Sequence, residues 1–331
     1  MTTAADTCEP RSGVSVQSPL RITVLLGGPS AEREVSLNSG KAVAAALKRL
    51  GHLVTCCDIS PTDLSALERP ADLVFIALHG TFGEDGQLQA ILSQREIPFV
   101  GSGPEASRLA MHKADSKEKF LEAGIPTPAF ELVTRGTMNC VLGSWRLPTI
   151  IKPVKEGSSV DITIARDAFA FQSTVEQLLC KYGECLIEEY IKGPELTVGI
   201  IGDKVLPVCE IRTPREFYDY EAKYAADSTE YLFDLDLPQA LLREIQQLSL
   251  EAHRVLGCRD FSRVDWMIDA VDLHPYVLEV NTIPGFTDHS LLPKAAARDN
   301  LSFDHLCRQI VSLAWDRVRA PSRALPTGSA T

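Results

Sequence analysis

The sequence has no apolar run that could cross a membrane and no excess of positive charge. Its longest apolar stretches, such as Leu73–Leu78, are far shorter than the roughly 20 residues that a membrane-spanning helix needs. Lysine and arginine number 33 against 44 aspartates and glutamates, so the net charge is −11. An acidic chain disfavours broad attachment to nucleic acids or anionic membranes, and we expect neither as a partner.

Paired-cysteine motifs and an export signal are also missing. The nine cysteines form no C-x-x-C pair, which predicts reduced thiols, mostly packed as small apolar side chains, in a cytoplasmic protein. The first residues contain no basic cluster followed by an apolar stretch, so we expect no secretory signal. Residues 1–20 and 320–331 are polar and aperiodic, and we expect both to be disordered tails.

Two common nucleotide-binding motifs are absent as well. The chain contains neither a complete G-x-G-x-x-G nor the G-x-x-x-x-G-K-[ST] of P-loop enzymes. The first absence argues against a dinucleotide-dependent oxidoreductase. Any nucleotide site in this chain must therefore use other residues.

The apolar pattern predicts two kinds of architecture. Up to about residue 103, short strands alternate with helical segments, which is typical of an open α/β sheet. Beyond that point strands and helices mix without alternation, which predicts an α+β half. The expected strands are 22–26, 53–57, 73–78, 98–101, 149–153, 161–165, 185–190, 196–201, 205–211, 263–268 and 276–280. The expected helices are 37–50, 112–123, 167–180, 238–256, 290–298 and 303–318.

Two strand ends in the first half carry candidate site residues. The turn Gly27-Gly28-Pro29-Ser30 leads through Glu32 into a helix. A helix N-terminus can bind phosphate, but a carboxylate there suits a substrate ammonium better, and a tight turn without a ligand explains the same residues. His79 follows the strand 73–78 at the edge where open α/β sheets bind ligands. A structural, hydrogen-bonded histidine is the alternative.

A lysine at a later strand end precedes a loop of small residues. Lys152 is followed by Glu156-Gly157-Ser158-Ser159. Such a loop can close its N–H groups and hydroxyls over phosphates, while the lysine supplies fixed positive charge. A surface hairpin is the alternative interpretation.

Two strands near the C-terminus give the strongest local signal. Side chains at i and i+2 of a strand share a face, so Arg263 points with Asp265, and Glu279 points with Asn281. Adjacent strands would bring these oxygens together, and oxygen ligands suit Mg²⁺ that bridges nucleotide phosphates. A solvated charged face explains less well why Asp265 and Glu279 lie within otherwise apolar strands.

In this order, the motifs resemble the D-alanine–D-alanine ligases of the ATP-grasp superfamily over residues 22–315. The matching segments are LLGGPSAEREVS (25–36), ALHG (77–80), GEDG (83–86), KPVKEGSS (152–159), GPE (193–195), FYDYEAKY (217–224), RVD (263–265) and EVNTIPG (279–285). The resemblance implies a mixed α/β and α+β chain with an ATP-grasp fold. It places an N-terminal Rossmann-like lobe at 21–103, a central lobe at 104–188 and a C-terminal lobe at 189–319, with ATP between the last two.

The resemblance also implies the reaction. The carboxylate of a first D-alanine attacks the γ-phosphoryl group of ATP, and the amine of a second D-alanine then displaces phosphate from the acyl phosphate. The product would be D-alanyl-D-alanine for peptidoglycan precursors. ATP would be the co-substrate, two Mg²⁺ (or Mn²⁺) ions would assist, and the enzyme would be a homodimer.

The resemblance assigns site residues one by one. The residues that match the nucleotide site are Lys113, Lys152, Ser159, Glu188, Glu189, Ile191, Glu195, Phe217 and Met267. The residues that match the metal ligands are Asp265, Glu279 and Asn281. Those that match the binding site of the second substrate are Lys223, Ser290 and Leu291.

The remaining matches concern the chemistry. Arg263 and the backbone N–H of Gly285 match an oxyanion hole, and Glu32 matches the group that binds the first ammonium. Glu32 also matches a hydrogen-bonded trio with Ser158 and Tyr224 that joins a loop to the site. The proton of the incoming amine could go to His79 or to the Ser158 and Tyr224 pair.

The chain departs from the family pattern at one point of the loop. Asp161 stands where glycine is usual, so we expect the mobility or closure of the loop to differ. The intact segment 221–224, with Tyr224, favours the dipeptide product over D-alanyl-D-lactate or the product of another D-amino acid. A nucleotide-binding regulator without catalysis is disfavoured because all the lysine, arginine and metal-ligand matches are present.

Overall fold

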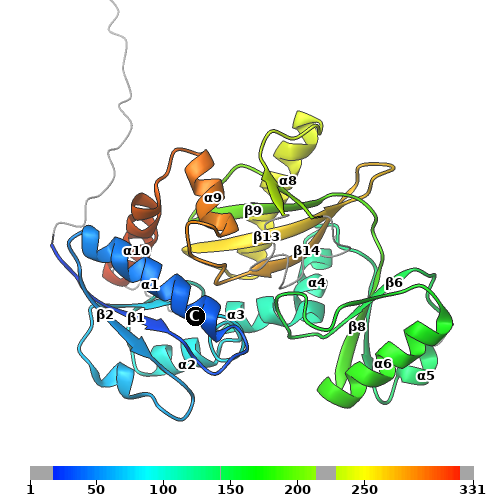
Figure 1. The fold of residues 1–331 in the computed structure, drawn as a ribbon, viewed down its shortest axis with the longest axis horizontal. Helices are drawn as coiled ribbons and strands as arrows, with labels where there is room; N and C mark the ends of the chain where they lie inside the picture. The colour runs from blue at the N-terminus through cyan, green and yellow to red at the C-terminus, as the bar shows by residue number, and fades with distance from the viewer. Residues whose placement is uncertain (1–17, 142, 214–228, 321–331) are drawn as a thin grey trace, which may run out of the picture.

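A computed structural model describes residues 18–141, 143–213 and 229–320 of the chain. Within them the strands form three sheets that follow one another along the long axis (Figure 1). The N-terminal sheet lies at the left of Figure 1, the largest sheet lies in the middle, and the sheet that contains β6 and β8 lies at the right. No helix in these ranges is long and apolar enough to cross a membrane.

The N-terminal sheet is parallel and has the order β2-β1-β3-β4. Its strands are β1 (Arg21–Leu26), β2 (Leu53–Asp58), β3 (Leu73–Ile76) and β4 (Phe99–Val100). Helix α1 (Arg33–Arg49) covers one face, and η1 (Ser65–Glu68) with α2 (Gln87–Gln94) covers the other. All four expected strands are confirmed, and β3 is buried along its length, as a parallel strand covered on both faces should be.

The largest sheet has the order β12-β11-β9-β13-β14, with β10 also paired to β9. Its strands are β9 (Glu195–Ile201), β10 (Lys204–Val205), β11 (Cys209–Arg212), β12 (Glu230–Leu232), β13 (Phe261–Ile268) and β14 (Pro275–Asn281). The expected single strand 205–211 is wrong, because the chain breaks into β10 and β11 around Pro207. A proline has no N–H to donate to a sheet. Helices α3 (Pro104–Met111), α4 (Lys113–Glu122) and α8 (Gln239–Val255) pack on one face.

The third sheet is antiparallel and has the order β5-β8-β6-β7. Its strands are β5 (Phe130–Thr134), β6 (Thr149–Lys152), β7 (Thr163–Ala165) and β8 (Glu184–Glu189), with α5 (Met138–Val141) and α6 (Ala168–Tyr182) packed against them. The sequence pattern did not predict β5. Helix α6 ends at Gly183, whose φ of +81° turns the chain directly into β8.

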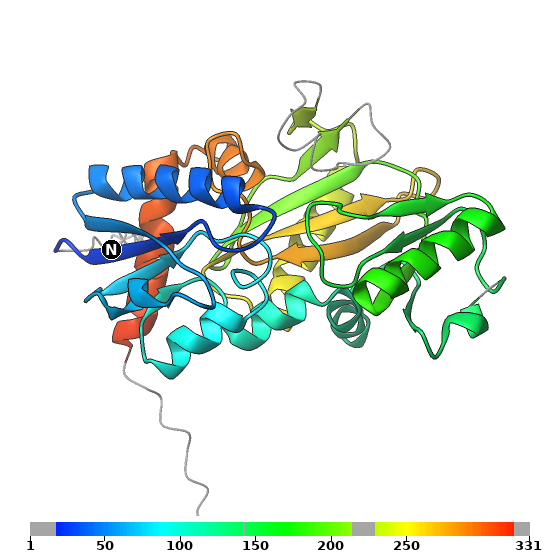
Figure 2. The same cartoon turned by 60° about the horizontal axis from the view of Figure 1, so that its bottom comes forward.

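The last two helices return to the N-terminal lobe. Helix α9 (Leu291–Arg298) and helix α10 (Phe303–Arg319) share one apolar core with α1 and β1. Figure 2 shows α10, in orange to red, beside the blue α1. Residues of β13 and of the segment after β14, namely Phe261 and Phe286, belong to the same core. The two lobes are therefore joined by a continuous apolar core and not only by a linker.

The thiols differ in their burial. The described cysteines, which exclude Cys8, are all free; four are buried, Cys57 is partly buried, and three, among them Cys56, are exposed. The expectation that most thiols are packed in the interior is therefore met only in part.

An ion pair between Asp260 and Arg317 links the N-terminal sheet to β13 and α10. Asp260, which is 5% exposed, accepts hydrogen bonds from the backbone N–H of Gly101 (2.8 Å) and from the guanidinium of Arg317. Arg317 also donates to the carbonyl oxygen of Phe99 (2.8 Å). The end of β4, the start of β13 and helix α10 thus meet at one carboxylate.

Asp260→Ala should lower the free energy of unfolding by about 3 kcal/mol, because it leaves a half-buried guanidinium and a buried N–H without their acceptor. Urea denaturation followed by circular dichroism measures the change. Asp203→Ala is the matched control, since Asp203 pairs with Arg254 at an exposed site and should cost well under about 1 kcal/mol. Equal losses for the two variants would contradict the assignment.

Candidate active site

Two cavities meet beneath the loop that follows β6. The larger, about 230 Å³, lies between the third sheet and the β13–β14 face of the largest sheet. The smaller, about 90 Å³, lies between the N-terminal lobe and the segment after β14. Gly157 and Ser158 line both, so the arrangement can bring a large and a small ligand into contact.

Two lysines expected at the nucleotide site line the larger cavity. Lys113 begins α4 and Lys152 ends β6. The Nζ of Lys152 lies 2.8 Å from Glu188 Oε1 on β8, and that of Lys113 lies 3.6 Å from Glu279 Oε2 on β14. Burial lowers the pKa of Lys113. Both lysine side chains are therefore buried and lie close to carboxylates.

Sequence reasoning missed a third lysine, Lys117. It is fully buried, its Nζ lies 3.1 Å from Glu188 Oε1, and it donates to Thr127 Oγ1 at 2.7 Å. Burial lowers its pKa to about 8. Burial alone would raise the pKa of Glu188, but Lys117 and Lys152 outweigh this effect and lower it. The position of Lys117 four residues after Lys113, on the same helix face, was the available signal.

The strand pair β13–β14 brings its polar residues together as the sequence predicts. Arg263 is paired with Asn281, and Asp265 with Glu279, and a bulge follows Asp265. The guanidinium of Arg263 donates to both carboxylate oxygens of Asp265 (2.9 and 2.6 Å), and the amide nitrogen of Asn281 donates to Asp265 Oδ2 (2.9 Å). The hydroxyl of Thr197 on β9 donates to Asp265 Oδ1 (2.6 Å).

The oxygen atoms that these side chains offer show whether the strand pair could bind a metal ion. In the described ranges no three His, Cys, Asp or Glu side chains converge on one point. The protein alone offers the carboxylates of Asp265 and Glu279, together with the amide oxygen of Asn281. Such a set fits Mg²⁺, which keeps several waters and takes further oxygens from substrate phosphates.

The loop that separates the cavities has a strained backbone. Ser158, Ser159 and Asp161 have φ values of +52°, +57° and +55°, a region that costs a non-glycine residue about 1 kcal/mol or more. The hydroxyl of Ser158 donates to Glu32 Oε1 at 2.5 Å, so the loop of the third sheet reaches the N-terminal lobe. Ser159 lines the larger cavity.

His79 lies deep in the smaller cavity. Its Nε2 is 3.1 Å from Ser39 Oγ, and its Nδ1 is 3.7 Å from Glu84 Oε1. Burial alone would lower the pKa of His79, but the carboxylates of Glu84 and Glu32 outweigh it and raise the pKa. Ser39 Oγ also accepts from the backbone N–H of Phe286 (3.1 Å). His79 is thus connected, through Ser39, to the segment that carries Gly285.

The rest of the smaller cavity is formed by the segment after β14. Gly285, Ser290 and Leu291 line it, as expected. A Cβ at Gly285 would lie 2.9 Å from Ser290 Oγ, so a side chain there would displace a polar group of the site. Other lining residues, which sequence reasoning did not single out, are Glu84, Tyr231, Thr287 and His289.

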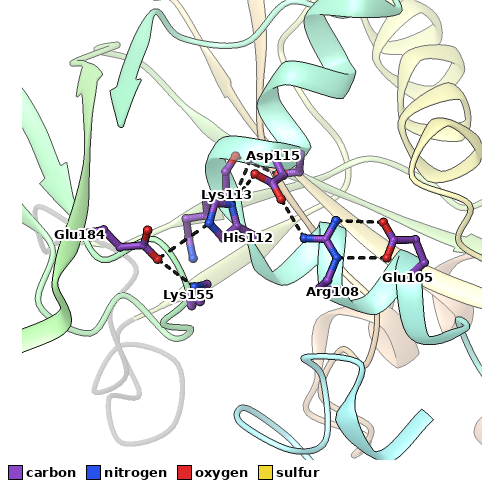
Figure 3. A network of polar contacts seen from close by, with 8 residues as sticks. Glu105, Arg108, His112, Lys113, Asp115, Lys155 and Glu184 are labelled. Carbon is purple, nitrogen blue, oxygen red and sulfur yellow. Dashed lines mark hydrogen bonds and ion pairs between the residues drawn. The ribbon is translucent and has the colours of Figure 1, made fainter. Parts of the chain in front are cut away.

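A network of polar side chains lies around the start of α4, next to Lys113 (Figure 3). His112, directly before Lys113, lies between Asp115 (Nδ1 to Oδ1, 2.9 Å) and Glu184 (Nε2 to Oε1, 3.9 Å). Arg108 pairs with Asp115 (2.9 Å). The start of α4 is thereby tied to α3 and to the first residue of β8.

The structure gathers the predicted residues into these two cavities. The larger contains Lys113, Lys152, Ser158, Ser159, Glu188, Glu189, Ile191, Glu195, Asp265, Met267 and Glu279. The smaller contains Glu32, His79, Ser158, Arg263, Asn281, Gly285, Ser290 and Leu291. The remaining three predictions, Phe217, Lys223 and Tyr224, lie outside the described residues.

Comparison with known proteins identifies the family of the chain. A family model described as D-ala D-ala ligase C-terminus matches residues 120–312, and one described as D-ala D-ala ligase N-terminus matches residues 61–102. The D-alanine–D-alanine ligase of Marinobacter nauticus is 46% identical over 294 residues, which cover 88% of this chain and 90% of that protein. The ligase of Bordetella petrii is 43% identical, with coverage of 92% and 94%.

Solved structures agree as well. The D-alanine–D-alanine ligase of Bacillus anthracis superposes with a TM-score of 0.80 at 35% identity, covering 90% of this chain and 98% of that one. A structure of that ligase complexed with ATP gives a TM-score of 0.77. The VanG D-Ala:D-Ser ligase of Enterococcus faecalis gives 0.80 at 28% identity, covering 90% and 100%. The chain has the ATP-grasp fold and belongs to the D-alanine–D-alanine ligase family.

Proposed function

We propose that this chain joins two D-alanine molecules into D-alanyl-D-alanine at the expense of ATP, for peptidoglycan precursor synthesis. One observation carries the proposal: a cavity lined by lysines and an apolar wall meets a smaller, polar cavity beneath one serine loop. The first suits a nucleotide and the second suits amino acids. The γ-phosphoryl group and the acceptor carboxylate would meet where Ser158 lines both.

In the first step, the lysines of the larger cavity would hold the phosphates. Lys113 and Lys152 would disperse the charge of the transferring phosphoryl group, which is the main task of a protein in phosphoryl transfer. Adenine would lie against the apolar wall that includes Ile191 and Met267, near Glu188. Bound Mg²⁺, held by Asp265, Glu279 and Asn281, would supply further charge neutralisation to the phosphates. Glu32 would hold the ammonium of the first D-alanine.

In the second step, the oxyanion of the tetrahedral intermediate needs donors fixed in advance. We assign this role to the guanidinium of Arg263, oriented by Asp265, and to the backbone N–H of Gly285. Ser290 and Leu291 would contact the second D-alanine, together with Lys223. Closure by the Ser158 loop would keep water away from the acyl phosphate.

The raised pKa of His79 bears on the fate of the amine proton. A raised pKa stabilises the protonated imidazole, which cannot accept a proton but is a good hydrogen-bond donor. We therefore assign His79 to positioning the Gly285–Phe286 backbone through Ser39, and proton acceptance to the Ser158 and Tyr224 pair.

We also propose a cytoplasmic homodimer and Mg²⁺ dependence, both on the strength of family membership. Sedimentation velocity of the purified chain measures the oligomeric state directly. A monomer at micromolar concentration would contradict the first proposal, and full activity in excess EDTA would contradict the second.

Purified protein with ATP and Mg²⁺ should release phosphate only when D-alanine is present, and chromatography should detect D-alanyl-D-alanine. Because the proposed second substrate attacks through its amine, D-alanine should be preferred over D-lactate as second substrate between pH 6 and 9. Preference for D-lactate across that range would contradict the dipeptide product. No phosphate release at millimolar substrate would instead favour a nucleotide-binding regulator.

Glu279→Gln should raise the Mg²⁺ concentration needed for half-maximal activity by about tenfold or more, because it removes one of two carboxylates of the metal site. Titration of Mg²⁺ at saturating ATP measures the shift. Glu68→Gln, at an exposed ion pair with Arg95, is the control and should leave the titration unchanged. A shift in both variants would refute the assignment.

The pH dependence of the KM for ATP should report Lys117. Its folded-state pKa of about 8 lies below the ordinary lysine value, so the charge is present below pH 8 and is lost above it. Glu188 then pulls more strongly on Lys152, and the KM for ATP should rise as pH increases through 8.

Lys117→Met should raise the KM by about tenfold, equivalent to about 1.4 kcal/mol, and abolish that rise, whereas Lys117→Arg should restore low KM. Lys119→Met, on the exposed side of the same helix, controls for loss of a lysine, and thermal melting controls for folding. A rise that persists in Lys117→Met would assign it to another group.

A further inference from the structure

We define the serine loop as residues 155–161. Side chains at one corner of the third sheet contact both ends of this loop. We call residues 181–184 the α6–β8 corner. Lys155 Nζ, at the start of the loop, lies 2.8 Å from Glu184 Oε1. At the end of the loop, Asp161 Oδ2 accepts from Lys181 Nζ (2.6 Å) and from the hydroxyl of Tyr182 (2.5 Å).

We propose that the α6–β8 corner is a clasp that holds the serine loop over the nucleotide, and that Asp161 is the positioning residue at its centre. The proposal deepens the ligase function proposed above and rests on it for the identity of the nucleotide. Asp161 itself does not line either cavity. Its effect on the reaction is exerted through Ser158 and Ser159.

The geometry of the corner explains how it reaches both ends. Gly183 has φ +81° and reverses the chain between α6 and β8. No atom lies within 4 Å of a Cβ built on it, so glycine is needed for the backbone turn and not for space. This reversal presents Lys181 and Tyr182 on one side of the turn and Glu184 on the other, the separation that the loop ends require.

The contacts at Asp161 reinforce one another. A single carboxylate oxygen accepts both donors, and the ammonium of Lys181 lies 4.9 Å from the centre of the Tyr182 ring. These hydrogen bonds, that of Lys181 first, lower the pKa of Asp161. The carboxylate is therefore charged, and the clasp is present, throughout the neutral range.

The loop needs such support because its own backbone opposes the observed shape. Ser158, Ser159 and Asp161 all have positive φ, and such residues persist only where surrounding contacts fix them. Within the loop, the backbone N–H of Val160 donates to the carbonyl oxygen of Gly157 (3.1 Å). The clasp at the ends and the Ser158–Glu32 bond at the tip supply further restraint.

The clasp is also connected to the phosphate-binding lysine of α4. Glu184, which holds Lys155, faces His112, the residue before Lys113 (Figure 3). Lys113 in turn donates to the carbonyl oxygen of Glu156 in the loop (2.5 Å). The lysine and the loop that would contact the phosphates therefore share one set of supports.

Asp161→Gly tests the proposal without straining the fold, since glycine accepts the same φ. We expect the KM for ATP to rise by about fivefold, the effect of losing a partly exposed charged contact, with kcat changed by less than about twofold. In ligand-free protein, hydrogen exchange at the amides of 157–160 should become faster. Asp161→Asn keeps an acceptor oxygen, so its KM for ATP and its exchange rate should lie between those of Asp161→Gly and the wild type.

Lys181→Met and Tyr182→Phe should shift the KM in the same direction, and neither should add to Asp161→Gly, because both act through its carboxylate. Asp203→Asn, at the exposed pair with Arg254, is the control and should change nothing. Full additivity with Asp161→Gly would overturn the shared contact.

The exchange measurement separates this proposal from the proposed function, because it needs no substrate. Unchanged exchange in Asp161→Gly would overturn the clasp, whatever the enzyme does. Faster exchange in a protein that joins no D-alanine would sink the ligase function and leave the clasp standing. Faster exchange with an unchanged KM for ATP would overturn the positioning role.

Discussion

The register between β13 and β14 is the constraint on which the site depends. Side chains alternate along both strands, so the pairing that sets Asp265 opposite Glu279 also sets Val264 opposite Val280. The two valines are buried in the apolar core beneath α8, while the polar pair faces the cavities. A slip of one residue would bury the carboxylates and expose the valines. The hydrophobic core therefore fixes the position of these polar groups.

In and beside the larger cavity, buried lysines are paired with carboxylates. Removal of three ammonium groups from water is costly unless carboxylates lie nearby. Lys117 and Lys152 share Glu188, and Lys113 has Glu279. At Glu188, two lysine side chains therefore face one carboxylate. The overall charge of −11 gave no hint of this local arrangement, because it is a sum over the whole chain.

The parts of the site that could be predicted are those governed by short-range periodicity. The alternation of Arg263 with Asp265 and of Glu279 with Asn281 is visible in the sequence, and the structure pairs them as predicted. Lys117 was missed because a lysine on an amphipathic helix looks solvent-exposed until the sheet that buries it is known. β5 was missed because its glutamate and threonine dilute the apolar pattern. The break at Pro207 was overlooked because flanking β-branched residues suggested one continuous strand, although proline carried the contrary signal.

The same reasoning explains why a strained loop serves as the boundary between the cavities. An acyl phosphate must be formed where ATP and an amino acid meet, and it must then be shielded from water while the second amine attacks. A loop that was stable alone in the closed shape would hinder entry of the nucleotide, whereas an unsupported loop would rarely adopt that shape. The serine loop is intermediate between these extremes, because Ser158 and Ser159 have positive φ and contacts at both loop ends and at Glu32 hold them there. The backbone strain favours opening of the loop and the side-chain contacts favour its closed shape, so that modest changes in either can shift the equilibrium.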